Sequence, residues 1–512
     1  MEQGPRPHSA PVVLGALQQV VPSAVVLHGS AAVLVGGVEL DSRLIRSGDL
    51  FAALAGHREH GIVHATEALR NGAVALLTDD EGWASWQSSG ESFAEVPVLV
   101  LDQARSWLGF IARAIYSGNA EQVQLVGVTG TNGKTTVASM VEAGMRASGM
   151  STGFIGTTGV RIGTEEIASL RTTPESSTIH ALLASMRERG VAGAAMEVSS
   201  HAMVEHRVAG LRFAAVGFAN LTQDHLDYHG TMDAYFDAKR LLFTSEHADF
   251  AVVCIDDAWG ERLAKLVTIP MATVSISGKH ADWTVVANGE GGWLVQSPSG
   301  ERTPLALALP GAFNRANAAL AIALLDRIGI SAAVAADALS RVQVPGRLQA
   351  VAGDAGSTDI SSFVDYAHTP DAIGRVVTAV RELTEGHIIV VVGAGGDRDV
   401  VKRPLMGAMA ARLADLVIVT DDNPRSEDPA AIRASVLEGA RALSAVNGAV
   451  VLEVGPRKEA IQRAVQLATP GDVVLVLGKG HEQGQEIAGT VLPFDDRVEL
   501  AQALSAREGA RS

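Results

Sequence analysis

A glycine-rich segment at residues 129–136 carries the residue types of a phosphate-binding loop. It reads Thr-Gly-Thr-Asn-Gly-Lys-Thr-Thr, follows the mostly apolar run Val123 to Val128 and precedes an amphipathic helical stretch. Backbone N–H groups in such a loop can surround phosphate oxygens. We expect Lys134 to reach the β- and γ-phosphates of a nucleotide and Thr135 to offer its hydroxyl to Mg²⁺. The strict Gly-x4-Gly-Lys-Ser/Thr spacing fails, because Gly127 lies one position too early. The alternative is a glycine-rich turn with a surface lysine.

Two segments place acids and imidazoles after apolar strands. Glu197 ends one strand, where a carboxylate faces the ligand crevice and can hold Mg²⁺; the alternative is an acid that caps the next helix. Residues 220–229 hold two histidines and two aspartates within six positions. Because histidine prefers Zn²⁺ to Mg²⁺, this segment alone indicates zinc, or else hydrogen-bonded surface histidines. Lys239, fourteen residues after His225, reads as an ordinary solvated helix lysine.

Asn314 and Asn317 lie beside the apolar helical run Ala318 to Leu325. Side-chain amides near a helix start can cap it. They can also recognise an adenine edge through their paired donor and acceptor. The residues leave both interpretations open.

Polar loops follow the predicted strands of the last third. Asp365 can bind ribose hydroxyls, and Glu482, in Gly-Lys-Gly-His-Glu, can pair with an ammonium. Arg398 and Arg425 follow neighbouring strands, and two guanidinium groups suit a carboxylate because each can bind it bidentately. Taken singly, the charged residue of each loop could simply be solvated. Four such loops on one sheet edge favour a binding crevice.

These residues need strands and helices to position them, and the apolar runs alternate accordingly. Alternating strands and helices indicate mostly parallel sheets. We predict an α/β fold of three consecutive α/β domains, 1–117, 118–343 and 344–512, with a phosphate-loop domain in the middle and a Rossmann-like domain last. Val344 to Arg347 reads as a hinge, and Ala506 to Ser512 as a frayed tail. The strand-like runs are Val33–Val38, Val74–Thr78, Val98–Leu101, Ala192–Val198, Phe213–Phe218, Phe250–Ile255, His387–Val392, Leu416–Thr420, Val450–Val454 and Val473–Leu477.

Composition narrows the function classes. The 512 residues suggest roughly three domains and carry a formal charge of −16, which argues against a general nucleic-acid binder. Cys254 is the single cysteine, so an intramolecular disulfide is excluded and a reducing cytoplasm is expected. It lies in an apolar run, where cysteines are usually inert. We find no signal peptide and no apolar run of about 20 residues that could span a bilayer.

Taken in order, these motifs resemble the Mur ligases, along nearly the whole chain. The phosphate loop alone would not be specific, but the ordered set is. The segments that carry the resemblance are Leu40-Asp-Ser-Arg43, Gly48-Asp-Leu-Phe51, Gly130 to Thr136, Thr172-Thr-Pro174, Glu197 to His201, Asn220 to Tyr228, Asp365 to Pro370 and Asp422-Asn-Pro-Arg425.

The resemblance implies ATP-dependent amide synthesis on UDP-MurNAc-L-Ala-D-Glu through an acyl phosphate, by a cytoplasmic enzyme that we expect to be a monomer acting on small molecules. It also implies a carbamate on Lys239, so that magnesium replaces our zinc interpretation. The implied catalytic residues are Lys134, Glu197, His225 and Lys239, and the implied metal residues are Thr135, Glu197, His225 and Lys239. The implied ATP contacts are Gly130, Thr131, Asn132, Gly133, Lys134, Thr135, Thr136, Asn317, Arg347 and Asp365. The implied UDP-sugar-peptide contacts are Leu40, Ser42, His57, Thr172, Thr173, Ser199 and Arg207.

The loop Asp422 to Arg425 resembles the signature of Mur ligases that add meso-diaminopimelate. That amino acid carries a second carboxylate beside its distal amine, and lysine does not. Lysine would therefore leave two buried guanidinium groups unpaired, at a cost on the order of 3–5 kcal/mol. Two positions depart from the family: 171 is Arg and 205 is Glu, which affects the UDP-peptide contacts. The implied diaminopimelate contacts are Arg398, Asp422, Asn423, Pro424, Arg425, Gly478 and Glu482.

Three other functions compete. A folylpolyglutamate synthetase shares the phosphate loop and the carbamate, but the segment around Ser42 and the loop at Arg425 argue against it. A phosphate-loop ATPase or kinase would form no amide. A non-catalytic nucleotide-binding scaffold would not need Lys134, Glu197, His225 and Lys239 together. Within the Mur ligases, addition of L-lysine is the alternative to diaminopimelate.

Overall fold

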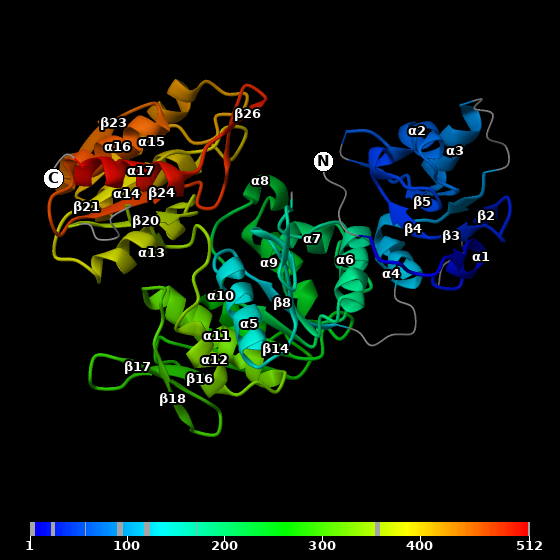
Figure 1. The fold of residues 1–512 in the computed structure, drawn as a ribbon, viewed down its shortest axis with the longest axis horizontal. Coiled ribbons are helices and arrows are strands. Elements are labelled where there is room, and N and C mark those ends of the chain that lie inside the picture. Colours follow the sequence, from blue (N-terminus) through cyan, green and yellow to red (C-terminus); the bar gives the residue numbers. More distant parts are fainter. Residues whose placement is uncertain are drawn as a thin grey trace.

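The chain forms three successive α/β units, as the sequence predicts, and Figure 1 shows them side by side with the middle unit between the other two. The structure is a computed structural model that describes residues 6–21, 26–56, 58–89, 96–116, 123–169, 171–353 and 359–509. No helix in these ranges is long and apolar enough to cross a membrane.

The N-terminal unit is a five-stranded sheet in the order β2-β7-β6-β5-β4, parallel except for β2. The predicted strand Val33–Val38 is instead two strands in two sheets. Gly36 separates them and donates its N–H to the Gly48 carbonyl at 2.8 Å. The elements are β1 (Val12–Val13), α1 (Leu14–Leu17), β2 (Val26–His28), β3 (Leu34–Val35), β4 (Gly37–Glu39), η1 (Ser42–Leu44), β5 (Asp49–Ala52), η2 (Gly61–His64), α2 (Ala65–Arg70), β6 (Ala75–Thr78), α3 (Asp80–Ser88), β7 (Val98–Val100) and α4 (Ala104–Tyr116).

The middle unit is an 11-stranded sheet in the order β11-β10-β9-β12-β8-β13-β14-β15-β16-β17-β18. The seven strands from β9 to β16 are parallel, and antiparallel strands extend both edges. Its strands are β8 (Gln124–Thr129), β9 (Thr152–Gly156), β10 (Gly159–Ile162), β11 (Glu165–Ile167), β12 (Gly193–Glu197), β13 (Ala215–Phe218), β14 (Ala251–Cys254), β15 (Met271–Ser275), β16 (Trp283–Ala287), β17 (Trp293–Gln296) and β18 (Arg302–Leu305).

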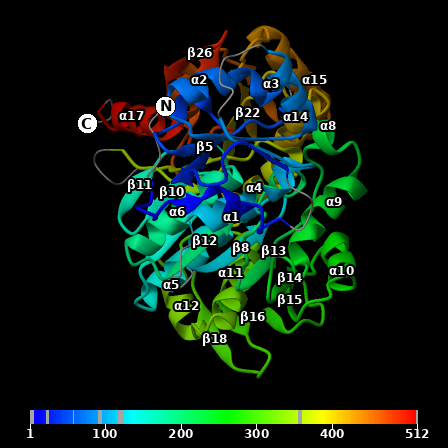
Figure 2. The same cartoon turned by 90° about the vertical axis from the view of Figure 1, so that its right-hand side faces the viewer.

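Helices cover both faces of this sheet over two separate apolar cores. One core packs α5, α11 and α12, and the other packs α6, α7, α9 and α10 (Figures 1 and 2). Helix α11 starts earlier than the apolar run Ala318 to Leu325 indicates, so Asn314 and Asn317 lie inside it. The helices are α5 (Lys134–Ala147), α6 (Ser176–Glu188), α7 (Ser200–Val204), α8 (Leu226–His229), α9 (Met232–Arg240), η3 (Leu241–Phe243), α10 (Ala258–Ala264), α11 (Ala312–Arg327) and α12 (Ala332–Leu339).

The C-terminal unit is a six-stranded sheet in the order β19-β20-β24-β21-β22-β23. Strands such as β21 (Ile-Ile-Val-Val-Val) are apolar throughout because helices bury both faces. The predicted frayed tail is helical as far as Gly509. The elements are β19 (Gln349–Ala350), β20 (Ser361–Asp365), α13 (Pro370–Arg381), β21 (Ile388–Val392), α14 (Lys402–Leu413), β22 (Leu416–Val419), α15 (Pro429–Asn447), β23 (Val450–Glu453), α16 (Arg457–Leu467), β24 (Val473–Leu477), β25 (Gly484–Ile487), β26 (Thr490–Pro493) and α17 (Asp496–Gly509).

The predicted hinge before this unit is a tight turn. Arg347 donates its N–H to the Val344 carbonyl at 3.0 Å, and Gly346 has φ +64°. A Cβ on Gly346 would lie 2.2 Å from the backbone nitrogen of His481. Glycine is therefore required where the turn presses against the loop after β24.

Candidate functional site

The predicted phosphate loop is a true strand–loop–helix turn at the centre of the middle sheet. Strand β8 lies between β12 and β13, and α5 begins at Lys134. Gly133 precedes the helix at φ +89°, a conformation that glycine adopts without strain. The neighbouring loop fixes the turn: Asn220 accepts from Thr131 N–H at 3.0 Å through its backbone carbonyl and from Asn132 N–H at 3.0 Å through its side chain.

Two lysines converge on one carbonyl oxygen of this loop. Lys134 Nζ donates to the Gly130 and Thr131 carbonyls, both at 2.9 Å, and Lys239 Nζ donates to the Gly130 carbonyl at 2.9 Å. Our expectation of a solvated Lys239 is wrong, since it is 1% exposed. Helix α9 turns it inward, with Nζ 4.6 Å from the centre of the Tyr235 ring, one turn earlier.

Burial changes the acid–base behaviour of both amines. It lowers the pKa of Lys239 well below the ordinary value, and the charge of Lys134 lowers it further. Burial also lowers the pKa of Lys134, although Glu197 and Asp224 oppose that shift. A lower pKa increases the fraction of neutral amine, which is the nucleophilic form.

Glu197 ends β12 beside the loop and is fully buried. Its carboxylate accepts from the Thr135 hydroxyl at 3.0 Å, the Thr157 N–H at 2.7 Å and the Thr157 hydroxyl at 3.1 Å. Glu197 does not cap the next helix, because Ser199 Oγ does so by accepting from Ala202 N–H at 3.2 Å. The capping alternative is therefore wrong, and carboxylate and hydroxyl oxygens lie together at the phosphate loop.

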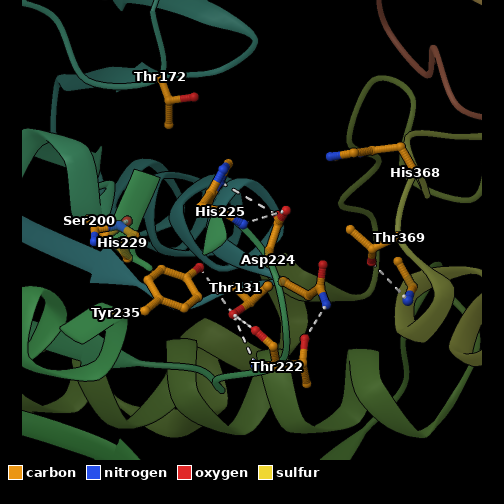
Figure 3. A network of polar contacts seen from close by, with 12 residues as sticks. Thr131, Thr172, Ser200, Thr222, Asp224, His225, His229, Tyr235, His368 and Thr369 are labelled. Carbon is orange, nitrogen blue, oxygen red and sulfur yellow. Dashed lines mark hydrogen bonds and ion pairs between the residues drawn. The ribbon is translucent and has the colours of Figure 1, made fainter. Parts of the chain in front are cut away.

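The histidine-rich loop after β13, residues 220–229, lies against the phosphate loop (Figure 3). Thr222 N–H donates to Thr131 Oγ1 at 3.0 Å, and the Tyr235 hydroxyl lies 3.2 Å from the same oxygen. His225 adopts φ +53° next to Asp224, with its Nε2 3.5 Å from the carboxylate. Among the described residues, no group of three or more His, Cys, Asp or Glu side chains is arranged to hold a metal.

Sequence reasoning gave no role to His201 or Tyr235. The His201 ring lies 4.8 Å from that of His225 and 4.2 Å from that of Tyr228, between centroids. Burial lowers the pKa of His201 and takes that of His229 to about 4, so both rings are neutral near pH 7. The sequence could have indicated His201, because it lies two residues after the expected site residue Ser199.

A cavity of about 780 Å³ extends from the phosphate loop to α11, α13 and the turn at Arg347. Arg347 Nη2 donates to Thr135 Oγ1 at 3.1 Å, and its guanidinium stacks on Tyr366 at 4.5 Å. Asp365, also in the lining, accepts from Leu348 N–H at 2.6 Å, and burial raises its pKa. Residues of the middle and C-terminal units thus share one cavity.

Asn314 and Asn317 line this cavity rather than cap α11. Asn314 Nδ2 donates to the Pro310 carbonyl at 2.8 Å, and Asn317 Nδ2 donates to Asn314 Oδ1 at 3.1 Å. Neither amide caps α11, whose N-cap residue, Gly311, has no side chain to do so. The Asn317 side chain packs on Gly133, where a Cβ would lie 2.5 Å from Asn317 Oδ1.

The residues expected to contact the UDP-sugar peptide occupy two units. In the N-terminal unit, Ser42 Oγ donates to Glu67 at 2.5 Å, Leu40 precedes it, and His57 lies outside the described residues. In the middle unit, Thr173 Oγ1 donates to the Glu197 carbonyl at 2.9 Å and accepts from Ser199 N–H at 3.0 Å. Thr172 Oγ1 lies 2.9 Å from Thr157 Oγ1, which itself contacts Glu197.

The two departures from the family pattern belong to one ion-pair network. Glu205 pairs with Arg207, and Arg171 pairs with Glu175. Glu175 also lies 3.3 Å from Arg207 Nε and 3.3 Å from Nη1 of Arg105, on α4 of the N-terminal unit. The extra arginine and the extra glutamate therefore compensate each other's charge, and sequence reasoning missed Glu175.

The residues expected to bind diaminopimelate gather at the carboxyl ends of β21, β22 and β24. Arg425 Nη1 donates to the Gly396 carbonyl at 2.5 Å. Asn423 Nδ2 donates to Glu482 Oε2 at 2.8 Å, and the buried Lys479 Nζ contacts Asn423 Oδ1 at 2.8 Å. Sequence reasoning missed Lys479, which holds this amide and carboxylate together.

Two glycines, Gly478 of the expected diaminopimelate contacts and Gly396 nearby, allow neighbouring loops to pack closely on the Asp422 to Arg425 loop. A Cβ on Gly478, at φ +118°, would lie 2.5 Å from Asp422 Oδ2, and one on Gly396 would lie 1.9 Å from the Pro424 carbonyl oxygen. The Asp422 to Arg425 loop therefore lies directly against its two neighbouring loops.

Our argument that lysine would leave two buried guanidinium groups unpaired is wrong in its premise. Arg398 is exposed, and the Arg425 side chain is 24% exposed with a carboxylate partner, Glu486, at 3.4 Å. Neither arginine is buried without solvent or a partner, so the cost of an unpaired buried charge does not apply at full size.

Comparisons with known proteins agree with this architecture. Three family models match in succession: "Mur ligase family, catalytic domain" over residues 34–116, "Mur ligase middle domain" over 128–325 and "Mur ligase, glutamate ligase domain" over 333–480. A relative from Corynebacterium glutamicum, named UDP-N-acetylmuramoyl-L-alanyl-D-glutamate--2,6-diaminopimelate ligase, is 45% identical over 93% of this chain and 93% of its own length.

Two further matches bear the same name. The Streptomyces coelicolor relative is 46% identical over 94% of each chain. A solved structure of a ligase so named superposes with a TM-score of 0.67 at 30% identity, covering 98% of this chain and 100% of that one.

Proposed function

This chain belongs to the Mur ligase family, and from that membership we propose that it is an ATP-dependent ligase that adds meso-2,6-diaminopimelate to UDP-N-acetylmuramoyl-L-alanyl-D-glutamate in peptidoglycan precursor synthesis. The observation that carries the proposal is the 45% identity, over 93% of both chains, to a relative with that printed name. The loop from Asp422 to Arg425, at the carboxyl ends of the C-terminal strands, supports the choice of amino acid.

The chemistry requires an activated acid. A carboxylate is a poor electrophile, so ATP would transfer its γ-phosphoryl group to the D-Glu side-chain carboxylate, giving ADP and an acyl phosphate. The neutral amine of diaminopimelate would then attack the acyl carbon. The tetrahedral intermediate would expel phosphate, and the nitrogen would lose its proton. Lys134, at the phosphate loop, would stabilise charge on the transferring oxygens.

The oxygen donors beside the phosphate loop fit a magnesium ion. Thr135 Oγ1 and the Glu197 carboxylate are 3.0 Å apart, and Mg²⁺ prefers such ligands. Lys239 as a free amine does not fit, but a carbamate on it would. We propose that Thr135, Glu197, His225 and carbamylated Lys239 hold the ion. Bound there, Mg²⁺ would neutralise phosphate charge.

The burial of Lys239 supports its carbamylation. Carbamate formation joins the neutral amine to CO₂ with loss of one proton, and burial favours that neutral form by lowering the pKa. The product is a carboxylate-like ligand in place of a cation. The Gly130 carbonyl and the Tyr235 ring hold the amine at the loop.

The remaining assignments follow from the family resemblance. We propose that Gly130 to Thr136, Asn317, Arg347 and Asp365 bind ATP. Leu40, Ser42, His57, Thr172, Thr173, Ser199 and Arg207 would bind the UDP-sugar peptide. Arg398, Asp422 to Arg425, Gly478 and Glu482 would bind diaminopimelate. We retain the domain division 1–117, 118–343 and 344–512, a cytoplasmic location and a monomeric state as proposals, testable by limited proteolysis, fractionation and sedimentation.

A phosphate-release assay tests the function. The purified chain with ATP, Mg²⁺ and UDP-N-acetylmuramoyl-L-alanyl-D-glutamate should release phosphate with meso-diaminopimelate, and mass spectrometry should detect the tripeptide product. L-lysine in its place should give far less. Phosphate release that needs no amino acid would indicate an ATPase, and faster turnover with L-lysine would overturn the choice of amino acid.

A further inference from the structure

The C-terminal unit carries a carboxylate of its own on the arginine expected to bind the substrate's carboxylate. We propose that Glu486 determines specificity: it occupies Arg425 in the absence of the amino acid and is displaced by the distal carboxylate of diaminopimelate. This inference rests on the proposed function, because it takes Arg425 as part of the amino-acid site.

The backbone fixes Glu486 beside the Asp422 to Arg425 loop. Arg425 N–H donates to the Glu486 carbonyl at 3.0 Å, and Ala488 N–H donates to the Arg425 carbonyl at 2.7 Å. Glu486 N–H donates to Asn423 Oδ1 at 3.1 Å, and Gln485 Nε2 donates to the Asp422 carbonyl at 2.6 Å. Strand β25 is therefore attached along this loop, and the Glu486 side chain starts next to Arg425.

Each of the two edges of the Arg425 guanidinium already has a partner on one of its nitrogens. A guanidinium binds a carboxylate through two adjacent N–H groups, along its Nε–Nη2 or its Nη1–Nη2 edge. Nη1 donates to the Gly396 carbonyl, and Nε lies 3.4 Å from Glu486 Oε2. The Gly396 carbonyl is backbone and cannot leave without a rearrangement of the loop. An incoming carboxylate that binds along the Nε–Nη2 edge must therefore replace Glu486.

Glu486 is suited to leaving. Its side chain is 41% exposed and that of Arg425 is 24% exposed, so the released carboxylate regains water at once. Exposed ion pairs of this kind are weak. The second arginine is close: a Cβ on Gly395 would lie 3.0 Å from Arg425 Nη1 and 3.8 Å from Arg398 Cγ. A substrate carboxylate placed between the two side chains would gain both guanidinium groups, whereas Glu486 pairs with Arg425.

The exchange gives discrimination without leaving a buried charge unpaired. An amino acid with a distal carboxylate displaces Glu486 and takes over Arg425. Lysine has no distal carboxylate, so Glu486 stays on Arg425 and lysine gains nothing from either arginine. Specificity is then the difference in free energy between binding that displaces Glu486 and binding that does not.

The test is the Glu486→Gln variant, with steady-state KM measured for meso-diaminopimelate and for L-lysine at saturating ATP and UDP-dipeptide. Glutamine keeps the shape and the backbone bonds and removes the competing charge. We expect KM for diaminopimelate to fall roughly two- to fivefold, the range that exposed ion pairs produce. KM for L-lysine should not fall, so the preference for diaminopimelate should increase.

Glu453→Gln is the matched control. Glu453 is 40% exposed and lies 3.0 Å from Arg433 Nε in the same unit, so it loses an equivalent ion pair outside the site. Its kinetics should equal those of the wild type. In an Arg425→Ala background, Glu486→Gln should have no further effect on KM, because the two side chains act on each other.

Three outcomes would overturn the proposal. KM for both amino acids could rise together, which would make Glu486 a ligand of the distal ammonium. KM could remain unchanged in Glu486→Gln, or the effect could persist in the Arg425→Ala background. Failure of the proposed function is a separate result, since there the wild-type enzyme itself would not turn over diaminopimelate.

Discussion

The phosphate loop of the middle unit and the two arginine-bearing loops of the C-terminal unit, at Arg398 and Arg425, treat charge in opposite ways. The middle unit buries Lys239 and Glu197 at the phosphate loop. The C-terminal unit leaves Arg398 exposed and pairs a partly exposed Arg425 with Glu486. A buried group acts in a low dielectric and is strong but not exchangeable, whereas an exposed pair is weak and can be replaced. The first arrangement suits bond making, and the second suits a choice between ligands.

Lys239→Ala should break the buried region most severely. Loss of a proposed metal ligand and of the contact to the Gly130 carbonyl should lower kcat on the order of a thousandfold, as loss of one preorganised electrostatic group does. High bicarbonate with a short-chain carboxylate should partly restore turnover. Lys458→Ala, at a lysine whose side chain is 52% exposed, is the control. Full activity of Lys239→Ala at limiting CO₂ would refute the carbamate.

Acid should destabilise the middle unit through His180. This buried imidazole donates from Nε2 to the Ala209 carbonyl at 3.0 Å, and burial lowers its pKa from 6.5 to about 4. Because the folded pKa lies below the unfolded one, the neutral form is favoured by folding. Stability is full above pH 6.5, falls as pH drops to about 4, and the total loss is about 3 kcal/mol.

Urea denaturation between pH 7 and pH 4, followed at the transition of the middle unit, measures how its free energy of unfolding depends on pH. His180→Gln keeps a donor but does not titrate, so its stability should depend less on pH across this interval. His280→Gln, at an exposed histidine, should retain the wild-type slope. An unchanged slope in His180→Gln would show that another group carries the acid sensitivity.

Arg425→Ala should weaken the binding of diaminopimelate without affecting the binding of ATP. Removing a guanidinium that the substrate's carboxylate would bind should raise KM for diaminopimelate on the order of tenfold, with KM for ATP unchanged. The effect is smaller than for Lys239 because Arg425 is partly exposed and already paired. Arg381→Ala, which removes an ion pair to Asp415 at the amino end of β22, the end opposite these loops, is the control. Diaminopimelate turnover equal to wild type would reject the clamp.

Gly395→Ala should give the smallest change. The new Cβ would lie 3.0 Å from Arg425 Nη1, so the guanidinium must move by a few tenths of an ångström. We expect KM for diaminopimelate to rise roughly two- to threefold, since a flexible side chain absorbs most of the overlap. Gly509→Ala, with open space around its Cβ, should change nothing. A large loss of stability instead would mean that the two arginine loops are rigid.

Much of the fold could be predicted from local patterns. Runs such as Ile388–Val392 and Val473–Leu477 are apolar on both sides and became central parallel strands. Val33–Val38 was wrongly taken as one strand, because its hydrophobicity does not reveal that Gly36 lets the chain leave one sheet for another. Cys254 was expected to be inert, and burial in β14 raises its pKa to about 12.

The residue types of the site could be predicted from the sequence, but which of its side chains are buried could not. Lys134 was recognisable because it lies in a glycine-rich loop after an apolar strand, and Glu197 because it ends another apolar strand. Lys239 was not, because a lysine on an amphipathic helix reads as solvated, and only the packing of α9 turns it toward Gly130. Glu486 was invisible for the same reason, since β25 meets the Arg425 loop across 61 positions of sequence.

The order of strands, loops and charged residues along this chain determined the α/β architecture, the phosphate loop and the family resemblance, because those depend on neighbours in sequence. Only the tertiary structure decided which charges are buried and which are paired. Burial depends on helices and hairpins distant in sequence, and it sets whether an amine is neutral and whether an arginine is already occupied.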